Sequence, residues 1–328
     1  MSEPVLSVKD LKVSFQTEEG KAIAIDGMNY DLKRGETLGI VGESGCGKTV
    51  SSLAIMGLLQ SPPAKIEAGE IIFHGENLIH KNDDEMRRIR GKQISMIFQE
   101  PMTSLNPLYT IGNQVSEVIK LHSSLDKEKA IHKSREMLDL VGIPDPDKCL
   151  NNYPHELSGG MRQRVMIAMS LACNPEILIA DEPTTALDVT IQAQILDLMS
   201  ELQRKFNTSI VLITHDLGVI AEMAHRVMVM YAGNVCEYSN VNPLFDNPLH
   251  PYTEGLLESI PFLDDKKPIL NPIKGSVPSP FNMPKGCVFN PRCPYAKEIC
   301  KSFVPELYSY DNRSVRCFKY SKQWQEGR

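Results

Sequence analysis

The sequence lacks a long apolar run, a secretory signal and an excess of positive charge. No uninterrupted apolar stretch in its 328 residues is long enough to span a bilayer as a helix. Residues 1–10 also lack the charged-then-apolar pattern of a signal peptide. We therefore expect a cytoplasmic location, and this expectation leaves attachment to a membrane protein open.

The charge and the cysteines are unevenly distributed along the chain. The net charge is −6, which argues against nucleic acid as the main partner. Residues 261–328 nevertheless contain 12 Lys and Arg against 6 Asp and Glu, so this tail is basic and the rest of the chain is acidic. The same tail holds four of the eight cysteines. In a cytosolic protein such clustering favours a metal site over disulfides.

Residues 42–49 read GESGCGKT and fit the phosphate-binding pattern G-x-x-x-x-G-K-[S/T]. The apolar, β-branched run 37–41 before them predicts a strand, and residues 50–59 after them suit a helix. The glycines let backbone N–H groups turn inward toward an anion at a helix N-terminus. Lys48 can then reach the β- and γ-phosphates, and Thr49 can bind Mg²⁺. The predicted nucleotide contacts in this stretch are Gly42, Glu43, Ser44, Gly45, Cys46, Gly47, Lys48, Thr49 and Val50.

The apolar patterns of the other segments predict strands that alternate with helices, which is typical of an α/β fold with a mainly parallel sheet. Further strands are predicted at 5–15, 22–32, 69–73, 93–98, 177–180 and 209–214, with a closing hairpin at 226–230 and 234–238. Helices are predicted at 81–90, 161–173, 190–202 and, as a helical insertion, within 111–140. Recurrent prolines after residue 242 predict a loop-rich extension. Phe15 ends the first strand, where it suits either adenine stacking or the core of a sheet.

Asp181 and Glu182 directly follow the buried strand predicted at 177–180. Carboxylates at the carboxyl end of such a strand point into the crevice where ligands bind an open α/β sheet. Asp181 suits Mg²⁺, usually through water, and Glu182 suits orienting or polarising an attacking water. Residues 157–161, LSGGM, precede a predicted helix, for which Ser158 is a suitable N-cap.

Together these motifs resemble those of the ABC ATPases. The LSGGM segment matches the family's signature motif, Gln99 its Q-loop, residues 186–188 its D-loop and His215 its switch histidine. Phe15 falls where the family carries its adenine-stacking aromatic side chain. The matching positions cover residues 5 to about 238 in the family's order.

The resemblance implies a head-to-tail dimer in which ATP, held by one phosphate loop, is closed over by the other subunit's signature motif. It implies catalytic roles for Glu182, His215, Gln99 and Lys48, and Mg²⁺ contacts through Thr49, Gln99 and Asp181. The further ATP contacts that it implies are Phe15, Gln99, Ser158, Gly159, Gly160, Asp188 and His215. The fold is then expected to be a P-loop NTPase core with an antiparallel β subdomain and a helical subdomain at about 111–173. The expected domains are 1–240 for the ATPase and 241–328 for the extension.

A closer similarity is to the ATPase subunits of bacterial dipeptide, oligopeptide and nickel importers. It rests on residues 98–107, 181–194, 215–218, 247–253 and 286–294. This resemblance implies a second ATPase subunit, a paralogue or a copy, two membrane permeases, and indirectly an extracytoplasmic peptide-binding protein. It implies peptide import powered from the cytoplasmic face of the bacterial membrane, with nickel or another small solute as the alternative cargo.

Two other classes compete with a transport ATPase. Soluble ABC ATPases of DNA repair or translation usually carry paired cassettes, coiled-coil insertions or basic surfaces, whereas this chain has one cassette, no heptad run and an acidic body. A P-loop kinase would leave the LSGGM segment unexplained. We therefore expect no nucleic-acid partner.

Cys287, Cys293, Cys300 and Cys317 follow the spacing C-x5-C-x6-C-x16-C in the Pro-rich extension. Unligated thiols, structural Zn²⁺ and an iron–sulfur cluster are all compatible with this spacing, although the close cysteine pairs usual for Zn²⁺ are absent. Resemblance to the peptide-importer ATPases implies a [4Fe–4S] cluster here. Lys285, Arg292 and Arg316 lie beside these cysteines in sequence and suit an anionic cluster. We expect a structural role, because none of the predicted ATP contacts lies in the extension.

Overall fold

The computed structural model describes residues 3–99, 104–185, 187–259 and 273–325. Two compact units are interleaved along the chain. The first unit contains Met1–Val5, Leu32–Thr37 and Asn77–Ile213, and the second contains Leu6–Asp31, Leu38–Glu76 and Thr214–Arg328. The second unit thus joins the phosphate loop with the extension, and the domain division at residue 240 stays a prediction.

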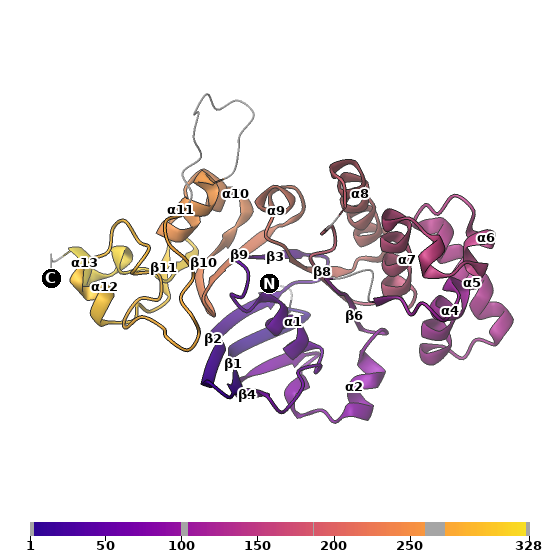
Figure 1. Cartoon of the computed structure of the whole chain (residues 1–328), viewed down its shortest axis with the longest axis horizontal. Helices are drawn as coiled ribbons and strands as arrows, with labels where there is room; N and C mark the ends of the chain where they lie inside the picture. The colour runs from indigo at the N-terminus through magenta and orange to yellow at the C-terminus, as the bar shows by residue number, and fades with distance from the viewer. Residues whose placement is uncertain (1–2, 100–103, 186, 260–272, 326–328) are drawn as a thin grey trace. The chain divides into compact units, whose positions relative to one another are not determined.

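An antiparallel sheet forms the N-terminal part of the second unit (Figure 1), with β1 between β2 and β4. Its main strands are β1 (Leu6–Thr17), β2 (Gly20–Leu32) and β4 (Ala64–Phe73). β1 pairs with β4 from Leu6 opposite Phe73 to Phe15 opposite Ala64. Leu6 and Val8 of β1 are buried on alternate positions, as are Leu11 and Val13, and the alternation changes phase at a register shift between Lys9 and Lys12. This sheet is the predicted antiparallel β subdomain, and β4 is longer than the strand predicted at 69–73.

The second unit also contains strands in the order β11-β12-β10-β9-β3. β3 (Thr37–Val41) runs parallel to β9 (Arg226–Tyr231), which forms the predicted hairpin with β10 (Asn234–Asn240). That hairpin does not close the sheet, because β12 (Arg313–Val315) pairs with the free side of β10 and β11 (Tyr308–Tyr310) pairs with β12. The predicted hairpin is confirmed, but it is not the last element of the sheet. β11 and β12 were not predicted, because strands of 3 residues are too short to show a period.

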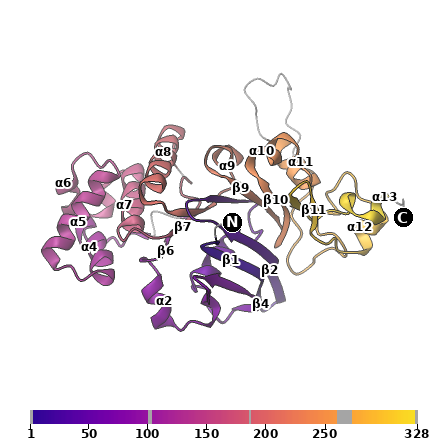
Figure 2. The ribbon, with the colours of Figure 1, turned by 180° about the vertical axis from the view of Figure 1, so that it is seen from behind.

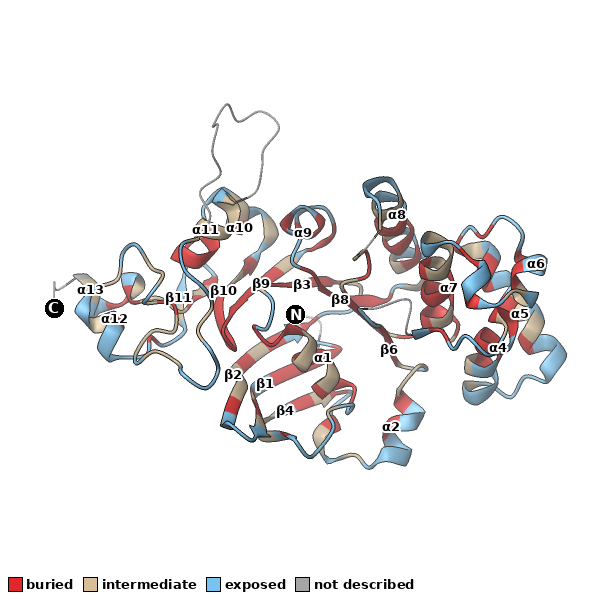
Figure 3. Cartoon of the chain, viewed as in Figure 1, coloured by how far each residue is buried: buried red, intermediate tan, exposed pale blue. Residues whose placement is uncertain are grey.

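Three parallel strands form the core of the first unit: β6 (Ile94–Ile97), β7 (Ile177–Asp181) and β8 (Ser209–Ile213). Every residue of the three strands is buried (Figure 3), which explains why their sequences are mainly apolar. The central strand β7 pairs with β6 on one side and β8 on the other. The mainly parallel α/β core is confirmed.

Helices of the first unit gather into one cluster, seen from both sides in Figures 1 and 2. They are α4 (Ile111–His122), α5 (Lys127–Leu140), α6 (Pro146–Asn151) and α7 (Gly159–Leu171). α4 and α5 confirm the predicted pair of helices. α6 was not predicted: it has 6 residues, and its main signal is the Asp145 N-cap followed by a proline. The unit also holds α2 (Asp83–Ile89) and α8 (Val189–Phe206).

The extension has more regular structure than its prolines suggest. After β10 come the helices α10 (Val241–Asp246), α11 (Pro251–Glu258), α12 (Glu298–Ser302) and α13 (Lys322–Gln325). Apart from α11, each has 6 residues or fewer, so loops still make up most of the described part of the extension. Pro251 starts α11 at the first helical position, where a missing N–H does no harm.

Candidate nucleotide site

The phosphate loop leaves the buried strand β3 and ends at α1 (Lys48–Ile55). Gly42 has φ 155° and Gly47, the N-cap of α1, has φ 101°. A Cβ at these positions would lie 2.1 Å from the Met230 carbonyl oxygen and 2.4 Å from that of Ala24. Both glycines are therefore required by backbone conformation and by close packing. The helix begins at Lys48 rather than at residue 50 as predicted, because the left-handed Gly47 lets the chain enter it two residues earlier.

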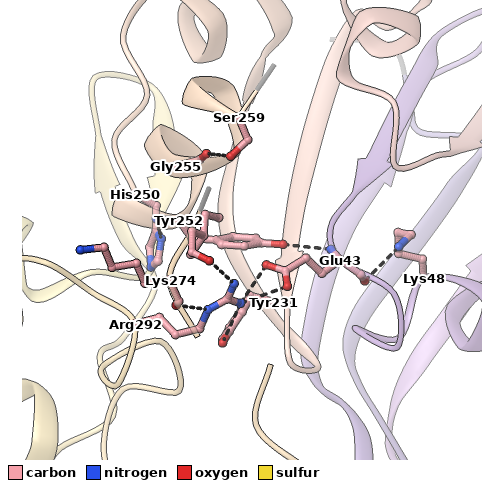
Figure 4. Close-up of polar contacts among 10 residues, drawn as sticks. Glu43, Lys48, Tyr231, His250, Tyr252, Gly255, Ser259, Lys274 and Arg292 are labelled. Carbon is pink, nitrogen blue, oxygen red and sulfur yellow. Dashed lines mark hydrogen bonds and ion pairs between the residues drawn. The ribbon is translucent and has the colours of Figure 1, made fainter. Parts of the chain in front are cut away.

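The Lys48 ammonium lies over the loop. Its side chain is buried, and Nζ donates to the carbonyl oxygens of Gly42 at 2.7 Å and Glu43 at 3.2 Å (Figure 4). This keeps a positive charge beside the inward-turned backbone of the loop, where the motif binds phosphates. Thr49, the second residue of α1, is half-buried.

Two side chains of the extension contact this loop at Glu43, and neither contact was predicted from the sequence. The Glu43 backbone N–H donates to the Tyr252 hydroxyl at 2.9 Å, and the Arg292 guanidinium donates to the Glu43 carboxylate at 2.9 and 3.0 Å. Both residues belong to segments noted for their resemblance to importer ATPases, but nothing in those segments indicates a contact with the loop. The extension therefore touches the phosphate loop, although none of the predicted ATP contacts lies in it.

His215 also belongs to the second unit, where it is exposed. Its neighbour Thr214 donates from its backbone N–H to the carbonyl oxygen of Ile40 in β3, at 3.3 Å. Asp216 then caps α9 (Leu217–Met223) by accepting from two backbone N–H groups. His215 is thus placed between a strand end and a capped helix, near the end of the strand from which the phosphate loop departs. Phe15 is half-buried in β1, and both of its predicted roles stay open.

Glu182 and Gln99 meet in the first unit. The Gln99 side-chain amide donates to Glu182 Oε2 at 3.1 Å, and the Thr185 hydroxyl donates to the same oxygen at 2.8 Å. Glu182 has a left-handed φ of 49°, and its backbone N–H donates to the Ile213 carbonyl at the end of β8. A non-glycine residue in this conformation is held there by its surroundings, as is common at functional sites. The sequence placed these two residues in one site, and their direct contact fits that prediction.

Asp181 closes β7 and is 1% exposed, so its carboxylate is buried directly beside Glu182 in sequence. Oxygen ligands of this kind suit Mg²⁺. The following segment is tied to the signature helix, because the buried Gln163 side chain of α7 donates to the Pro183 carbonyl. The helix that presents the signature motif is thus hydrogen-bonded to the chain just after the carboxylate pair.

Ser158 caps α7, as predicted, with Oγ accepting from the Met161 backbone N–H at 3.3 Å. Ser158 and Gly159 are exposed, and Gly160 packs so closely on Ile191 that an added Cβ would lie 2.9 Å from it. Asp188 caps α8 by accepting from the Ile191 N–H at 2.9 Å. The first unit therefore presents an open helix N-terminus, which attracts anions. Ala186 and residues 100–103 of the predicted loops lie outside the described residues.

Cys287, Cys293, Cys300 and Cys317 line one pocket of the second unit, together with Phe289, His250 and other side chains. Burial is the main cause that raises the pKa of Cys293 to about 11 and that of Cys317 to about 12, and the neighbouring thiols raise both further. Gly286, with φ 73°, brings the Cys287 N–H within 2.8 Å of the Cys300 carbonyl. Within the described ranges, no group of Cys, His, Asp or Glu is arranged to hold a metal ion.

Comparison with known proteins agrees with this geometry. Residues 25–185 match the family described as "ABC transporter", and residues 236–300 match "Oligopeptide/dipeptide transporter, C-terminal region". A dimeric ATP-binding cassette in a post-hydrolysis state bound to ADP and Pi is 29% identical, with a TM-score of 0.64 over 72% of this chain and 98% of the other. A Clostridium perfringens cassette from the ABC transporter complex cbiONQ is 27% identical, with a TM-score of 0.63 over 75% and 92%. The fold and the motifs define an ABC-type ATPase.

Longer matches narrow this class. The chain is 53% identical to the oligopeptide transport ATP-binding protein AppD of Bacillus subtilis over 98% of both chains. It is 53% identical to the dipeptide transport ATP-binding protein DppD of the same organism, over 96% of this chain and 95% of that one. It is 50% identical to the oligopeptide transport ATP-binding protein OppD of Escherichia coli, over 97% of this chain and 94% of that one. The chain belongs to the ATP-binding proteins of the oligopeptide and dipeptide ABC transporter family. No helix in the described part of the chain has the length and apolarity to cross a membrane.

Proposed function

We propose that the chain powers the import of dipeptides or oligopeptides by hydrolysing ATP beneath a pair of membrane permeases. The observation that carries the catalytic part is the contact of Gln99 and Thr185 with the Glu182 carboxylate, which fixes a base directly after a buried, Mg²⁺-suited Asp181. The peptide cargo is supported by the names of relatives that match nearly the full length. Nickel is the alternative cargo, because the earlier resemblance includes nickel importers.

The proposed roles follow from where the residues lie. Backbone N–H groups of the loop 42–49, apart from that of Glu43, which donates to Tyr252, bind the phosphates together with the Lys48 ammonium. Glu182 orients and deprotonates the attacking water. Gln99 holds the Glu182 carboxylate in place, and His215 contacts the γ-phosphate. Thr49, Gln99 and Asp181 provide oxygen atoms that suit Mg²⁺, which neutralises charge on the phosphates when bound.

Partners follow from the exposed signature motif. The N-terminus of α7, with its exposed Ser158, can bind an anion, and the proposed anion is a phosphate group. We assign that phosphate to ATP held by the phosphate loop of a second ABC ATPase subunit, a paralogue or a copy, in a head-to-tail dimer. The dimer is placed at the cytoplasmic face of the bacterial membrane, under two permeases that receive peptide from an extracytoplasmic binding protein. Co-purification with a permease pair tests this assembly, and its absence after co-expression would count against it.

Ser158→Arg is expected to block ATP-dependent dimer closure while monomeric ATP binding is kept. A bulky cation would replace a small cap at a helix end that must approach phosphate. Sizing chromatography of the hydrolysis-deficient chain with its partner cassette and ATP measures the effect. Ser124→Arg, at an exposed position in the same unit, is the matched control. A normal ATP-dependent dimer with Ser158→Arg would remove the signature motif from the account.

We also assign a [4Fe–4S] cluster to the four-cysteine pocket, with Zn²⁺ as the alternative. A single Zn²⁺ needs four sulfurs converging at ~2.3 Å, whereas a cluster presents separate irons to more widely spaced thiolates. The observation that all four thiols line one pocket supports the cluster. When bound, such a group crosslinks segments that have little core of their own. Its role is then to hold the extension together.

Anaerobic purification is expected to give brown protein with bound iron and sulfide. Colourless protein with one equivalent of zinc would favour the alternative.

Cys293→Ser should make residues 273–325 sensitive to protease, because one of the four crosslinked segments is released. Cys173→Ser, outside the extension, is the control. A tail as protease-resistant as in the wild type would show that these cysteines do not hold it together.

A further inference from the structure

Arg292 of the extension pairs with the phosphate loop inside the second unit. Its Nη1 donates to both carboxylate oxygens of Glu43, at 2.9 and 3.0 Å, and the Arg292 side chain is 6% exposed against 29% for Glu43. A buried guanidinium on a partly shielded carboxylate makes a charge-assisted contact that solvent screens only weakly. The pair joins residues 249 positions apart.

The guanidinium is held on every side (Figure 4). Nε donates to the Lys274 carbonyl at 3.0 Å and Nη2 to the Ile273 carbonyl at 3.3 Å. Its carbon lies 5.6 Å from the centre of the Tyr231 ring, in a cation–π arrangement. Because these contacts fix the planar fork, Arg292 presents its charge to Glu43 from one direction only.

Tyr252 fixes the backbone of the same loop residue. It receives the Glu43 N–H at 2.9 Å and stands at the start of α11, where His250 Nδ1 caps the helix by accepting the Tyr252 N–H. The buried Glu237 of β10 accepts the N–H groups of Leu249 and His250 and so anchors this turn. Glu43 is therefore held twice by the second unit, once through its amide and once through its carboxylate.

The phosphate loop carries the Glu43 carboxylate close to the groups that are proposed to bind the phosphates of ATP. Lys48 Nζ donates to the Glu43 carbonyl at 3.2 Å, so the carboxylate and the phosphate-binding ammonium belong to neighbouring parts of one turn. An uncompensated negative charge here would repel the β- and γ-phosphates and could attract the Lys48 ammonium away from them. We propose that Arg292 is a positioning residue for nucleotide binding, which neutralises and orients Glu43 so that the loop can accept ATP. This inference rests on the proposed role of the loop as the ATP site.

The same contact connects the four-cysteine pocket to the nucleotide. The Phe289 carbonyl accepts the N–H groups of both Arg292 and Cys293, each at 3.0 Å, so one turn sets the positions of the guanidinium and of a cysteine. Phe289 lines the cysteine pocket and packs against Tyr231 and Tyr252, with ring centres 5.2 and 5.5 Å apart. How well ordered the cysteine pocket is therefore determines how firmly Arg292 and Tyr252 hold Glu43. By this route the extension influences the affinity of the loop for ATP.

Arg292→Ala in the full chain is expected to raise the Kd and KM for MgATP by about tenfold, with kcat at saturating ATP changed less than twofold. Arg313→Ala is the matched control: Arg313 is 5% exposed, belongs to the same extension and donates to the carbonyls of Pro243 and Asn247. It should leave the Kd for MgATP within twofold of wild type, because it does not contact the loop. Equal losses in the two variants would overturn the proposal and indicate a general structural effect.

The double variant Glu43→Gln with Arg292→Ala tests the charge-neutralising role separately from any loss of stability in Arg292→Ala. Removing the carboxylate removes the need for its partner, so the double variant should recover most of the lost affinity. No recovery would contradict the charge-neutralising role. Lys48→Ala, titrated alongside, distinguishes failure of the inference from failure of the proposed ATP site. If Lys48→Ala binds MgATP as tightly as the wild type, the loop is not the ATP site. If Lys48→Ala loses affinity and Arg292→Ala does not, only the role of Arg292 is overturned.

Discussion

Glu182→Gln is expected to lower the rate of ATP hydrolysis by about 10²–10⁴-fold and to leave ATP binding intact. The amide keeps the shape of the side chain and can still contact Gln99 and Thr185, which both bond Oε2 in the native protein. It loses the charge needed to take a proton from the attacking water. Steady-state ATPase rates, paired with a nucleotide titration of the same variant, measure the two effects separately.

Glu176→Gln is the matched control for this substitution. Glu176 precedes the same strand β7 at its other end, where it pairs with Arg34. Loss of one charge there should leave the turnover rate near that of the wild type. If Glu182→Gln hydrolysed ATP as fast as Glu176→Gln, Glu182 would not be the catalytic base.

Lys48→Ala is expected to weaken nucleotide binding itself, with a Kd raised by about 10- to 100-fold. A hydrogen bond to a charged group contributes roughly 1.5–3 kcal/mol, and each 1.4 kcal/mol is a factor of ten. The Lys48 side chain is buried over the loop, so water cannot substitute for its contacts with the phosphates. Titration with a fluorescent ATP analogue measures the Kd.

Lys65→Ala provides the comparison for loss of a lysine charge. Lys65 is in β4 of the same unit, and its side chain is 69% exposed. Its removal should not change the Kd, because an exposed charge is screened by solvent and salt. Equal affinities in Lys48→Ala and Lys65→Ala would show that the loop does not bind phosphate through Lys48.

Much of the core followed from the sequence, because each element there carries its own local signal. β3, β7 and β8 are mainly apolar, and all of their residues are buried. The cap of α7 at Ser158 was visible from a small polar residue at the start of a helical pattern. The contact of Gln99 with Glu182 cannot be predicted from either segment. The sequence assigned both residues to one site only because both motifs match the same family.

The contacts that the sequence could not predict are those between distant segments. Arg292 and Tyr252 carry no local pattern that indicates Glu43, and Arg292 was interpreted only as a charge beside a cysteine cluster. Likewise, β12, which pairs with β10, has only 3 residues, too few for an alternating pattern to be recognised. Such pairings depend on where folding brings whole segments together, and that information is spread over the chain.

ATP-dependent uptake of a labelled tripeptide tests the central claim most directly. The complete transporter, with its permeases, partner ATPase and binding protein, is placed in vesicles with this chain as wild type or Glu182→Gln. We expect peptide to accumulate only with the wild-type chain and ATP, and labelled nickel not to accumulate. Equal peptide uptake by the two forms would contradict the catalytic account, and accumulation of nickel without peptide would contradict the proposed cargo.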